Sequence, residues 1–382
     1  MGRIVIELFV NQAVNATDNF LQLCKSKSYK KTYFHRVICN FMVQGGNNEV
    51  KSPITESAYP YDGEKKLAKG GHSIFKSNEN SYGDFKDENL GNLDNSFLVC
   101  MANLGRPNTN RSQFFITTAS ASHLNGKHTI VGKVTHGKSV VRAIEHVEVY
   151  STDPEDARGW IPKDPVVVAD CGVWNKDKDD TPVYCCCEDS LGGDVFEEYP
   201  DDNERLEEMN LSLDNPEQAY SICLVIKKSA TMLLQHKRYQ DSLYKYKKAM
   251  RYCNELLPDE EKHKEDYDKF LDLKKTLYLN LAFVSLQLLE YQKCIDYCGY
   301  LFEFINDNKG VKLTSIQVSK AFFRLGKAFE GLKRYTEALD ALKNGLAVNI
   351  EDAGIKAEVV KVKKLKFESE KGERMRYARF FN

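Results

Sequence analysis

The chain has 382 residues, a net charge of −1 and 42% hydrophobic residues. This length suggests two or three domains of ordinary size. The absence of an 18-residue apolar run and of a secretory signal argues against a membrane span or export. Eleven cysteines occur without a CxxC pair, and the adjacent Cys185, Cys186 and Cys187 are poorly spaced for one metal ion. We therefore expect a soluble cytoplasmic protein without a metal or cofactor.

Charge is unevenly distributed along the chain. Residues 1–175 carry 20 Lys/Arg and 18 Asp/Glu, residues 176–217 carry 3 and 15, and residues 218–382 carry 31 and 22. The local net charges are thus +2, −12 and +9. Residues 175–217 are predicted to be an acidic, partly disordered linker, although residues 192–200 contain apolar side chains that can dock on a neighbour. The basic last domain carries no nucleic-acid-binding motif, so an acidic peptide partner is expected and no nucleic acid.

The first domain, residues 1–174, combines a helix with many short apolar runs. The alternation in residues 3–9 predicts a half-buried strand, and Asn15 is a candidate N-cap for a helix with Asp18 in its first turn. Residues 33–173 consist of short apolar segments separated by Gly, Asn and Pro, and Ser139 to Ile144 fits a second short helix. This pattern predicts an antiparallel β-barrel.

Four segments of this domain bring together aromatic, amide and basic residues. They place Arg36 with Phe41, Met42 and Phe115, and with the amides Gln44, Asn103 and Gln113; the segments are Phe34-His35-Arg36-Val37, residues 41–46, Met101-Ala102-Asn103 and residues 112–116. An apolar cup with one fixed cation and several amides can hold a proline ring and grip the peptide bond before it.

Together with Gly83–Asn89 and Leu124–His128, these segments resemble the cyclophilin family of peptidyl-prolyl isomerases over residues 2 to about 174. The resemblance implies rotation about Xaa–Pro bonds in client polypeptides, without a cofactor or a nucleophile. It implies catalytic roles for Arg36, Phe41 and Gln113. The substrate-binding residues that it implies are His35, Met42, Gln44, Ala102, Asn103, Phe115, His123, Leu124 and His128.

Three departures from the family pattern are expected to matter. His123 stands where family members generally have tryptophan, so cyclosporin binding should be weakened. Leu104 replaces a small residue and Arg106 is inserted before Pro107, and both could narrow the groove. The family's first strand is not matched, which predicts a barrel that is open on one side.

From Ala219 onward, residues recur at helical spacing with internal repetition. When Tyr239, Tyr291 and Tyr335 are aligned, small residues recur nine positions earlier and three positions later. The pattern resembles three tetratricopeptide repeats in residues 218–351, with extra residues in 258–272 and 306–313. This predicts an all-α solenoid. A basic helix in residues 352–382 would cap it, because an uncapped solenoid leaves its last apolar face wet; Val359, Val362, Leu365 and Phe367 would form the inner face.

Both domains together resemble the cyclophilin 40 class of chaperone-associated immunophilins. The resemblance implies a clamp for the acidic C-terminal tail of heat-shock protein 90. Its residues would be Lys227, Thr231, Asn280, Lys320 and Arg324. Lys320 and Arg324 are four residues apart and so share one helix face. Thr231 replaces the family's first asparagine, and its hydroxyl is expected to donate one hydrogen bond, which predicts a weakened clamp.

Other functions fit the same residues. The first domain could be a client-binding surface with negligible turnover, which would make the protein a pure adaptor. The helical domain could bind other acidic tails, such as that of heat-shock protein 70. The last helix resembles a basic calmodulin target, although a solvated capping helix is favoured.

Overall fold

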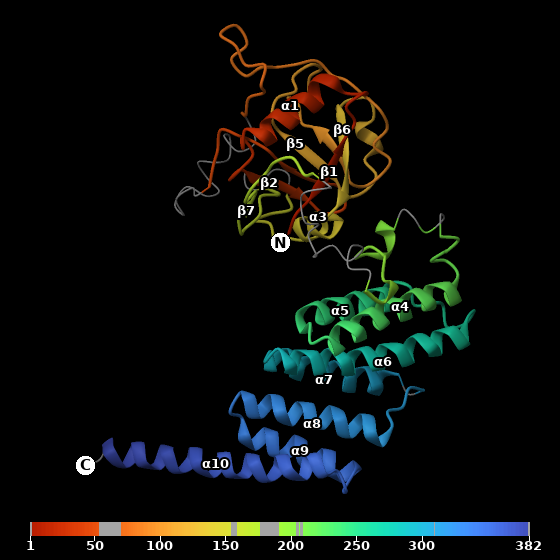
Figure 1. The fold of residues 1–382 in the computed structure, drawn as a ribbon, viewed down its shortest axis with the longest axis vertical. Helices are drawn as coiled ribbons and strands as arrows, with labels where there is room; N and C mark the ends of the chain where they lie inside the picture. The colour runs from red at the N-terminus through yellow and green to blue at the C-terminus, as the bar shows by residue number, and fades with distance from the viewer. Residues whose placement is uncertain are drawn as a thin grey trace. The chain divides into compact units, whose positions relative to one another are not determined.

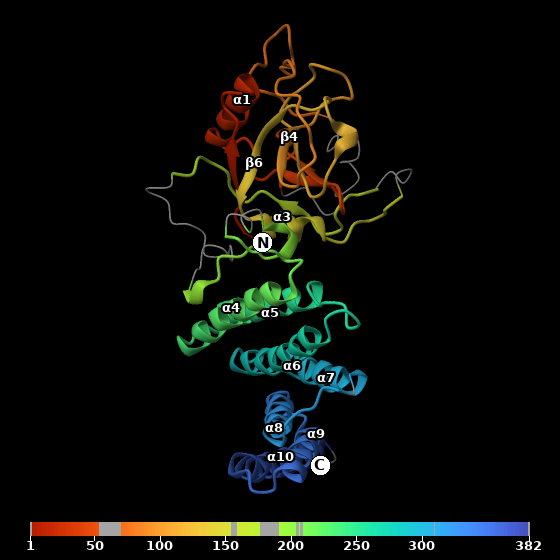
Figure 2. The same ribbon diagram turned by 90° about the vertical axis from the view of Figure 1, so that its right-hand side faces the viewer.

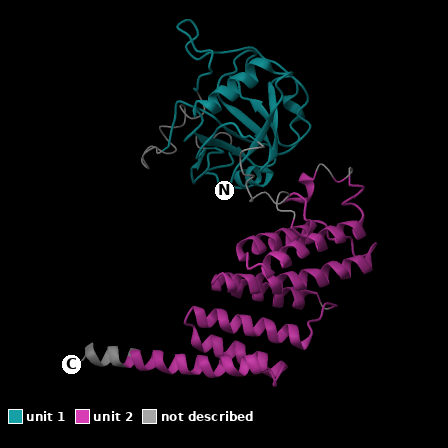
Figure 3. Ribbon diagram, viewed as in Figure 1, with its two compact units in different colours: residues 1–188 teal, residues 189–382 magenta. Residues whose placement is uncertain are grey.

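The computed structural model describes residues 2–52, 70–153, 159–175, 191–203, 206, 209–308 and 310–380, without the side chains of residues 373 and 375–380. The chain divides into two compact units, residues 1–188 and residues 189–382 (Figure 3). We call them the β unit and the helical unit. No described helix is long and apolar enough to cross a membrane. Cys185, Cys186 and Cys187 lie outside the described residues.

The β unit is built on a curled antiparallel sheet of seven strands (Figure 1). The strand order is β1-β6-β4-β5-β3-β2-β7, so that the sheet ends at β1 and β7. This confirms the predicted antiparallel β fold. The strands are β1 Val5–Leu8, β2 Tyr33–Ile38, β3 Met42–Gly45, β4 Leu98–Met101, β5 Phe114–Thr117, β6 Ile130–His136 and β7 Val166–Val167.

Helix α1, Val14–Lys25, is capped by a distant residue. Asn15 lies inside the first turn and not at the N-cap, so the predicted cap is wrong. Instead, one carboxylate oxygen of Glu88 accepts the Asn15 N–H at 3.2 Å and the other accepts the Ala16 N–H at 3.0 Å. A carboxylate satisfies the free N–H groups of a helix start as well as a local cap does.

The helical unit contains three antiparallel helix pairs followed by a single helix (Figures 1 and 2). Tyr239, Tyr291 and Tyr335 each begin the second helix of a pair, and the residue two positions earlier has a positive φ of 59 to 61° in all three turns. This threefold repetition is consistent with tetratricopeptide repeats. The helices are α4 Pro216–Gln235, α5 Tyr239–Glu255, α6 Lys264–Gln287, α7 Tyr291–Asp307, α8 Ser315–Gly331, α9 Tyr335–Val348 and α10 Ala353–Phe380.

Small residues allow the two helices of each pair to approach closely. Ala230, Ala282 and Gly326 are buried in the first helices. A Cβ atom added to Gly326 would lie 2.6 Å from the Leu342 Cγ, closer than real carbon atoms approach. The residue at this position of the repeat is therefore restricted by the packing of the paired helix.

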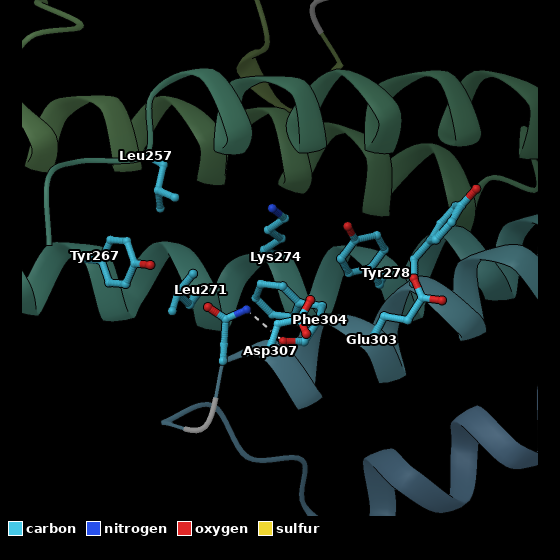
Figure 4. A pocket seen from close by; sticks show the side chains of 10 residues that line it. Leu257, Tyr267, Leu271, Lys274, Tyr278, Glu303, Phe304 and Asp307 are labelled. Carbon is cyan, nitrogen blue, oxygen red and sulfur yellow. Dashed lines mark hydrogen bonds between the residues drawn. The ribbon is translucent and has the colours of Figure 1, made fainter.

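A pocket of about 330 Å³ lies beside α6 and α7, and some residues that lengthen the repeat spacing line it (Figure 4). Its lining includes Tyr267 and Leu271 from the longer α6, and Asp307 from the end of α7. Lys274 points into it, with its ammonium nitrogen 5.3 Å from the centre of the Phe304 ring.

Part of the predicted linker packs on α5. The Asp194 carboxylate is fully buried between Lys245 and Lys248, and its Oδ1 atom accepts from the Lys248 Nζ at 2.8 Å. The Tyr252 hydroxyl donates to the Glu197 carbonyl at 2.8 Å. Residues 194–203 therefore belong to the folded helical unit.

Helix α10 covers the last pair with fewer residues than expected. Val362 is fully buried and Val359 packs against the same cluster, which is centred on α9. Phe367, however, is 67% exposed, so its predicted place on the inner face is wrong. The reason is helical spacing: Phe367 follows Val362 by five residues, which turns it away from the face that Val362 buries.

Candidate active site

The central strands of the β unit carry two rows of side chains on opposite faces. One row crosses four strands: Val37 pairs with Val43, Val43 with Ile116, and Ile116 with Val99. All four belong to the interior core together with Phe20 and Leu23 of α1. In the next row, Arg36 pairs with Gln44, Gln44 with Phe115, and Phe115 with Cys100. Because side chains alternate along strands, this second row faces away from the interior core.

The second face carries the apolar part of the predicted site. Met42 and Phe115 are buried in one cluster, and Phe41, Ala102 and Leu124 pack against its edge. The structure thus brings together five of the predicted residues from four different segments. The cluster also contains residues that the motifs do not include: Leu93, Cys100, Ala121 and Ile130, with Phe9, Ile38 and Leu98 at its edge. Strand alternation predicts the side of Cys100, but no local signal identifies Leu93.

The predicted amides form a connected chain beside this cluster. The Gln44 Nε2 donates to the Gln113 Oε1 at 3.1 Å, and the Gln113 Nε2 donates to the Gly70 carbonyl at 3.1 Å. The Ala102 N–H donates to the Gln113 carbonyl at 3.0 Å. These bonds fix the position of the Gln113 side chain, and the Gln44 Nε2 uses one of its two protons for the bond to Gln113.

Asn103 holds two loops together. Its Nδ2 donates to the Lys127 carbonyl at 2.9 Å, and its Oδ1 accepts from the Gly105 N–H at 3.0 Å. The side-chain oxygen is therefore engaged within the protein. Leu104 and Arg106, which follow it, are both exposed.

Two histidines stand beside the aromatic residues of the cluster. The His123 ring lies 4.9 Å from the Phe41 ring, and the His128 ring meets the Phe115 ring edge-on at 5.1 Å. The His128 Nδ1 lies 3.0 Å from the Met101 carbonyl, so this nitrogen carries the proton in the neutral ring. Burial lowers the pKa of His128, which favours that neutral form.

Arg36 supplies the cation. Its side chain is exposed whereas its strand neighbours Phe34, His35 and Val37 are buried. Among the described residues no side chain forms a hydrogen bond or ion pair with its guanidinium. Partial burial lowers the pKa of Arg36, but an arginine stays charged at neutral pH. The guanidinium is therefore available to a ligand on this face.

His35, a predicted substrate-binding residue, is buried in the described part of the chain. It is only 3% exposed, and neither ring nitrogen has a hydrogen-bond partner of good geometry in the described part of the chain. Burial lowers the pKa of His35 to about 4, against a weaker opposing effect of the Tyr33 backbone. His35 lies at a β-bulge: Phe34 pairs with Gly45 and Arg36 with Gln44, so His35 is the extra residue.

The residues of the predicted clamp lie on the first helices of the three pairs. Lys227 and Thr231 are on α4, Asn280 is on α6, and Lys320 and Arg324 are on α8. The Arg324 Nη1 donates to the Leu279 carbonyl at 2.6 Å, which places its guanidinium beside Asn280 in the chain. Burial lowers the pKa of Arg324. Lys320 is exposed.

The Thr231 hydroxyl does not behave as expected. It donates to the Lys227 carbonyl at 2.9 Å and lies 2.9 Å from the Tyr246 hydroxyl. A hydroxyl has one proton, so Thr231 has no proton left for a ligand in this arrangement. The expectation that it donates one clamp hydrogen bond is wrong for this geometry.

Comparison with known proteins places these observations in a family. Residues 1–173 match the model of the cyclophilin type peptidyl-prolyl cis-trans isomerases. The chain is 38% identical to the peptidyl-prolyl cis-trans isomerase CYP7 of Saccharomyces cerevisiae, covering all of this chain and 96% of that protein. It is 32% identical to the peptidyl-prolyl cis-trans isomerase D of Mycosarcoma maydis, covering all of this chain and 92% of that one.

A solved structure also has sequence similarity to part of this chain. It is the cyclophilin type peptidyl-prolyl cis-trans isomerase of Cryptosporidium parvum in the presence of the dipeptide Ala-Pro. The sequence identity is 32% over 45% of this chain and 93% of that chain, and the TM-score is 0.36.

Proposed function

The chain belongs to the cyclophilin family of peptidyl-prolyl cis-trans isomerases, and we propose that it is a co-chaperone whose helical unit binds the acidic C-terminal tail of heat-shock protein 90. The observation that carries this proposal is the placement of a cation, an apolar cup and fixed amides on one sheet face, joined in the same chain to helix pairs with basic residues. The β unit would then act on proline-containing clients that the chaperone holds. We place this activity in the cytoplasm.

Isomerisation needs a site that prefers the twisted peptide bond. The barrier is about 18–20 kcal/mol because the C–N bond has partial double-bond character. Twisting removes that character and returns a lone pair to the prolyl nitrogen. We assign Arg36 to donate a hydrogen bond to this nitrogen. Because the lone pair is available only in the twisted state, such a donor lowers the barrier and does not merely bind substrate.

The cup and the amides position the substrate in this proposal. Phe41, Met42, Phe115 and Leu124 would surround the proline ring, with His123 and His128 at the sides. The side chains of Gln44 and Gln113 and the backbone at Ala102 would grip the flanking peptide. The described bonds of these groups hold them in place before the substrate arrives, which avoids an ordering cost on binding.

Cyclosporin binding would be weak. His123 contacts Phe41 at the cup, but its ring offers less apolar area than tryptophan. A change of this size in an apolar pocket is worth about 1–3 kcal/mol. Titration of cyclosporin against the native chain and His123→Trp tests this: the variant should bind more tightly, and equal affinities would assign the limit to another residue.

In the helical unit, Lys227, Asn280, Lys320 and Arg324 would bind the terminal carboxylates of a Glu-Glu-Val-Asp tail. Charge-assisted hydrogen bonds to carboxylates are the strong ones, and the tail ends in two carboxylates. Calorimetry with a pentapeptide that has a free or an amidated C-terminus tests the proposal. The free peptide should bind more tightly, and equal binding of both would exclude this clamp.

The alternative is a pure adaptor, in which the cup binds clients without appreciable turnover. Exposed Leu104 and Arg106 on the loop after Asn103 favour it, because they can restrict access to the groove. Exchange NMR on a Xaa–Pro peptide separates the two functions. Line broadening of the bound peptide by catalysed exchange supports isomerisation, whereas binding without exchange supports the adaptor.

A further inference from the structure

The turn between β2 and β3 carries one wall of the cup. The Phe41 N–H donates to the Ile38 carbonyl at 3.2 Å, which closes the turn, and Asn40 adopts a left-handed φ of 56°. Asparagine tolerates this conformation better than most residues. Phe41 and Met42 follow directly, so the geometry of the turn determines where their side chains stand.

Glu145, the last residue of α3 (Lys138–Glu145), contacts this turn through its buried carboxylate. The Glu145 Oε1 accepts the Asn40 N–H at 2.8 Å, and the Glu145 side chain is fully buried. The residues are 105 positions apart. Nothing in the motif around Phe41 points to this contact, because it joins separate elements.

Arg142 joins the carboxylate to the other side of the turn. Its Nη1 donates to the Glu145 Oε2 at 3.0 Å and to the Thr118 carbonyl at 2.8 Å. The Thr118 N–H in turn donates to the Phe41 carbonyl at 2.9 Å. The chain of contacts therefore holds both the N–H of Asn40 and the carbonyl of Phe41, the backbone groups on either side of the peptide bond that joins them.

We propose that Glu145 and Arg142 are positioning residues that fix the Asn40–Phe41 turn and thereby set the wall of the proline cup. The proposal rests on the role assigned above to Phe41 and Met42. Both oxygens of the carboxylate are used, one by the turn and one by the arginine. Hydrogen bonds of this kind are charge-assisted and stronger than neutral ones, and burial strengthens them further.

The first test is kinetic and uses the full-length protein. Glu145→Gln keeps the shape of the side chain and an acceptor for Asn40, but it removes the charge that pairs with Arg142. We expect a looser cup, with KM for a Xaa–Pro peptide raised about tenfold and a smaller change in kcat. Glu88→Gln is the matched control: its carboxylate also accepts backbone N–H groups, but on α1. It should lower stability and leave KM unchanged.

A second test observes the turn directly. Selective 15N labelling of asparagine reports on Asn40 and on Asn15, whose N–H groups are bound by Glu145 and by Glu88 respectively. Hydrogen exchange of the Asn40 amide should accelerate in Glu145→Gln and not in Glu88→Gln, with the reverse pattern at Asn15. If Glu145→Gln does not fold, Arg142→Met takes its place, because methionine has no N–H group to donate to Glu145 or to the Thr118 carbonyl.

The outcomes separate this inference from the proposed function. Unchanged Asn40 exchange and unchanged KM in Glu145→Gln overturn the positioning role. Faster Asn40 exchange with unchanged KM also overturns it, because the turn would then not affect the cup. If Arg36→Ala leaves turnover unchanged, the assigned catalytic face fails. KM and Asn40 exchange in Glu145→Gln still decide whether the turn affects substrate binding.

Discussion

In the β unit, the buried Glu145 carboxylate contacts the turn that carries Phe41, whereas in the helical unit the buried Asp194 carboxylate contacts α5, which carries none of the proposed clamp residues. Glu145, Arg142 and His35 are all next to strands or turns that carry site residues. Asp194, Lys245 and Lys248 instead attach residues 194–203 to the helical unit. Loss of the Glu145 contact should therefore affect substrate binding, whereas loss of the Asp194 contacts should affect the stability of the helical unit and not peptide binding.

The largest loss of stability is expected when the buried charge cluster of the helical unit, Asp194 with Lys245 and Lys248, is broken. Asp194→Ala leaves two buried lysines without their carboxylate, which typically costs about 3–5 kcal/mol of unfolding free energy. Unfolding of the helices is measured by far-UV circular dichroism. Both tryptophans of the chain, Trp160 and Trp174, lie in the β unit, so their fluorescence should be unchanged. The exposed Asp201 provides the control, and an equal loss in Asp201→Ala would contradict the comparison.

The second prediction concerns acid stability of the β unit. His35 has a pKa of about 4 in the folded protein because of burial, against an ordinary value of about 6.5. Between these values the unfolded chain binds a proton that the folded chain does not, so stability falls as the pH drops from 6.5 to 4. The shift corresponds to about 3 kcal/mol.

Tryptophan fluorescence during urea unfolding at several pH values measures this effect. His35→Leu should reduce the acid dependence, whereas the same substitution at the exposed His123 should not. Identical pH profiles for the native chain and His35→Leu would show that another group controls acid unfolding of the β unit.

The third prediction tests whether Arg36, on the sheet face that carries the cup, contributes to isomerase activity. Arg36→Ala should reduce kcat/KM for a Xaa–Pro peptide about 100-fold, the usual cost of removing one preorganised donor. Because no described side chain pairs with the guanidinium, unfolding of the β unit should change little. Turnover equal to that of the native chain would favour the pure adaptor.

Much of the fold follows from local residue patterns. The tyrosine register predicts a threefold repetition, and the structure places each tyrosine at the start of α5, α7 or α9 because each repeat uses the same turn. The cup follows from motifs in which neighbouring residues act together. The Glu88 cap, the Asp194 cluster and the Glu145 contact were not predictable in this way. Each joins a single charged residue to a segment far along the chain, and such a residue has no periodicity to identify it.

The burial of His35 was also not predicted. A β-bulge places it as the extra residue between the pairs Phe34–Gly45 and Arg36–Gln44, which a sequence pattern does not reveal. The Thr231 hydroxyl is similar, because its partner Tyr246 lies on the paired helix. In both cases another element determines the surroundings of the residue: β3 at His35 and α5 at Thr231.

The fourth prediction separates binding from stability within the clamp. Lys320→Ala and Arg324→Ala should each weaken binding of the free acidic pentapeptide by about 1.5–3 kcal/mol, the range for a hydrogen bond to a charged group. Lys320 is exposed, so its loss should not affect unfolding. Arg324 binds the Leu279 carbonyl and lies over the Phe283 ring, so its loss should also destabilise the helices. Undiminished peptide binding by the double variant would exclude the clamp.

The smallest expected effect is at Thr231. Its proton goes to the Lys227 carbonyl, so Thr231→Val, which removes the hydroxyl at nearly constant shape, should leave peptide affinity unchanged. Thr231→Asn adds an amide whose oxygen can accept from the Tyr246 hydroxyl while its nitrogen donates to the peptide. One such bond is worth about 0.5–1.5 kcal/mol, a gain of a few-fold in affinity by calorimetry. Weaker binding in Thr231→Val would mean that the hydroxyl reorients toward the peptide, and the clamp would then use all five positions.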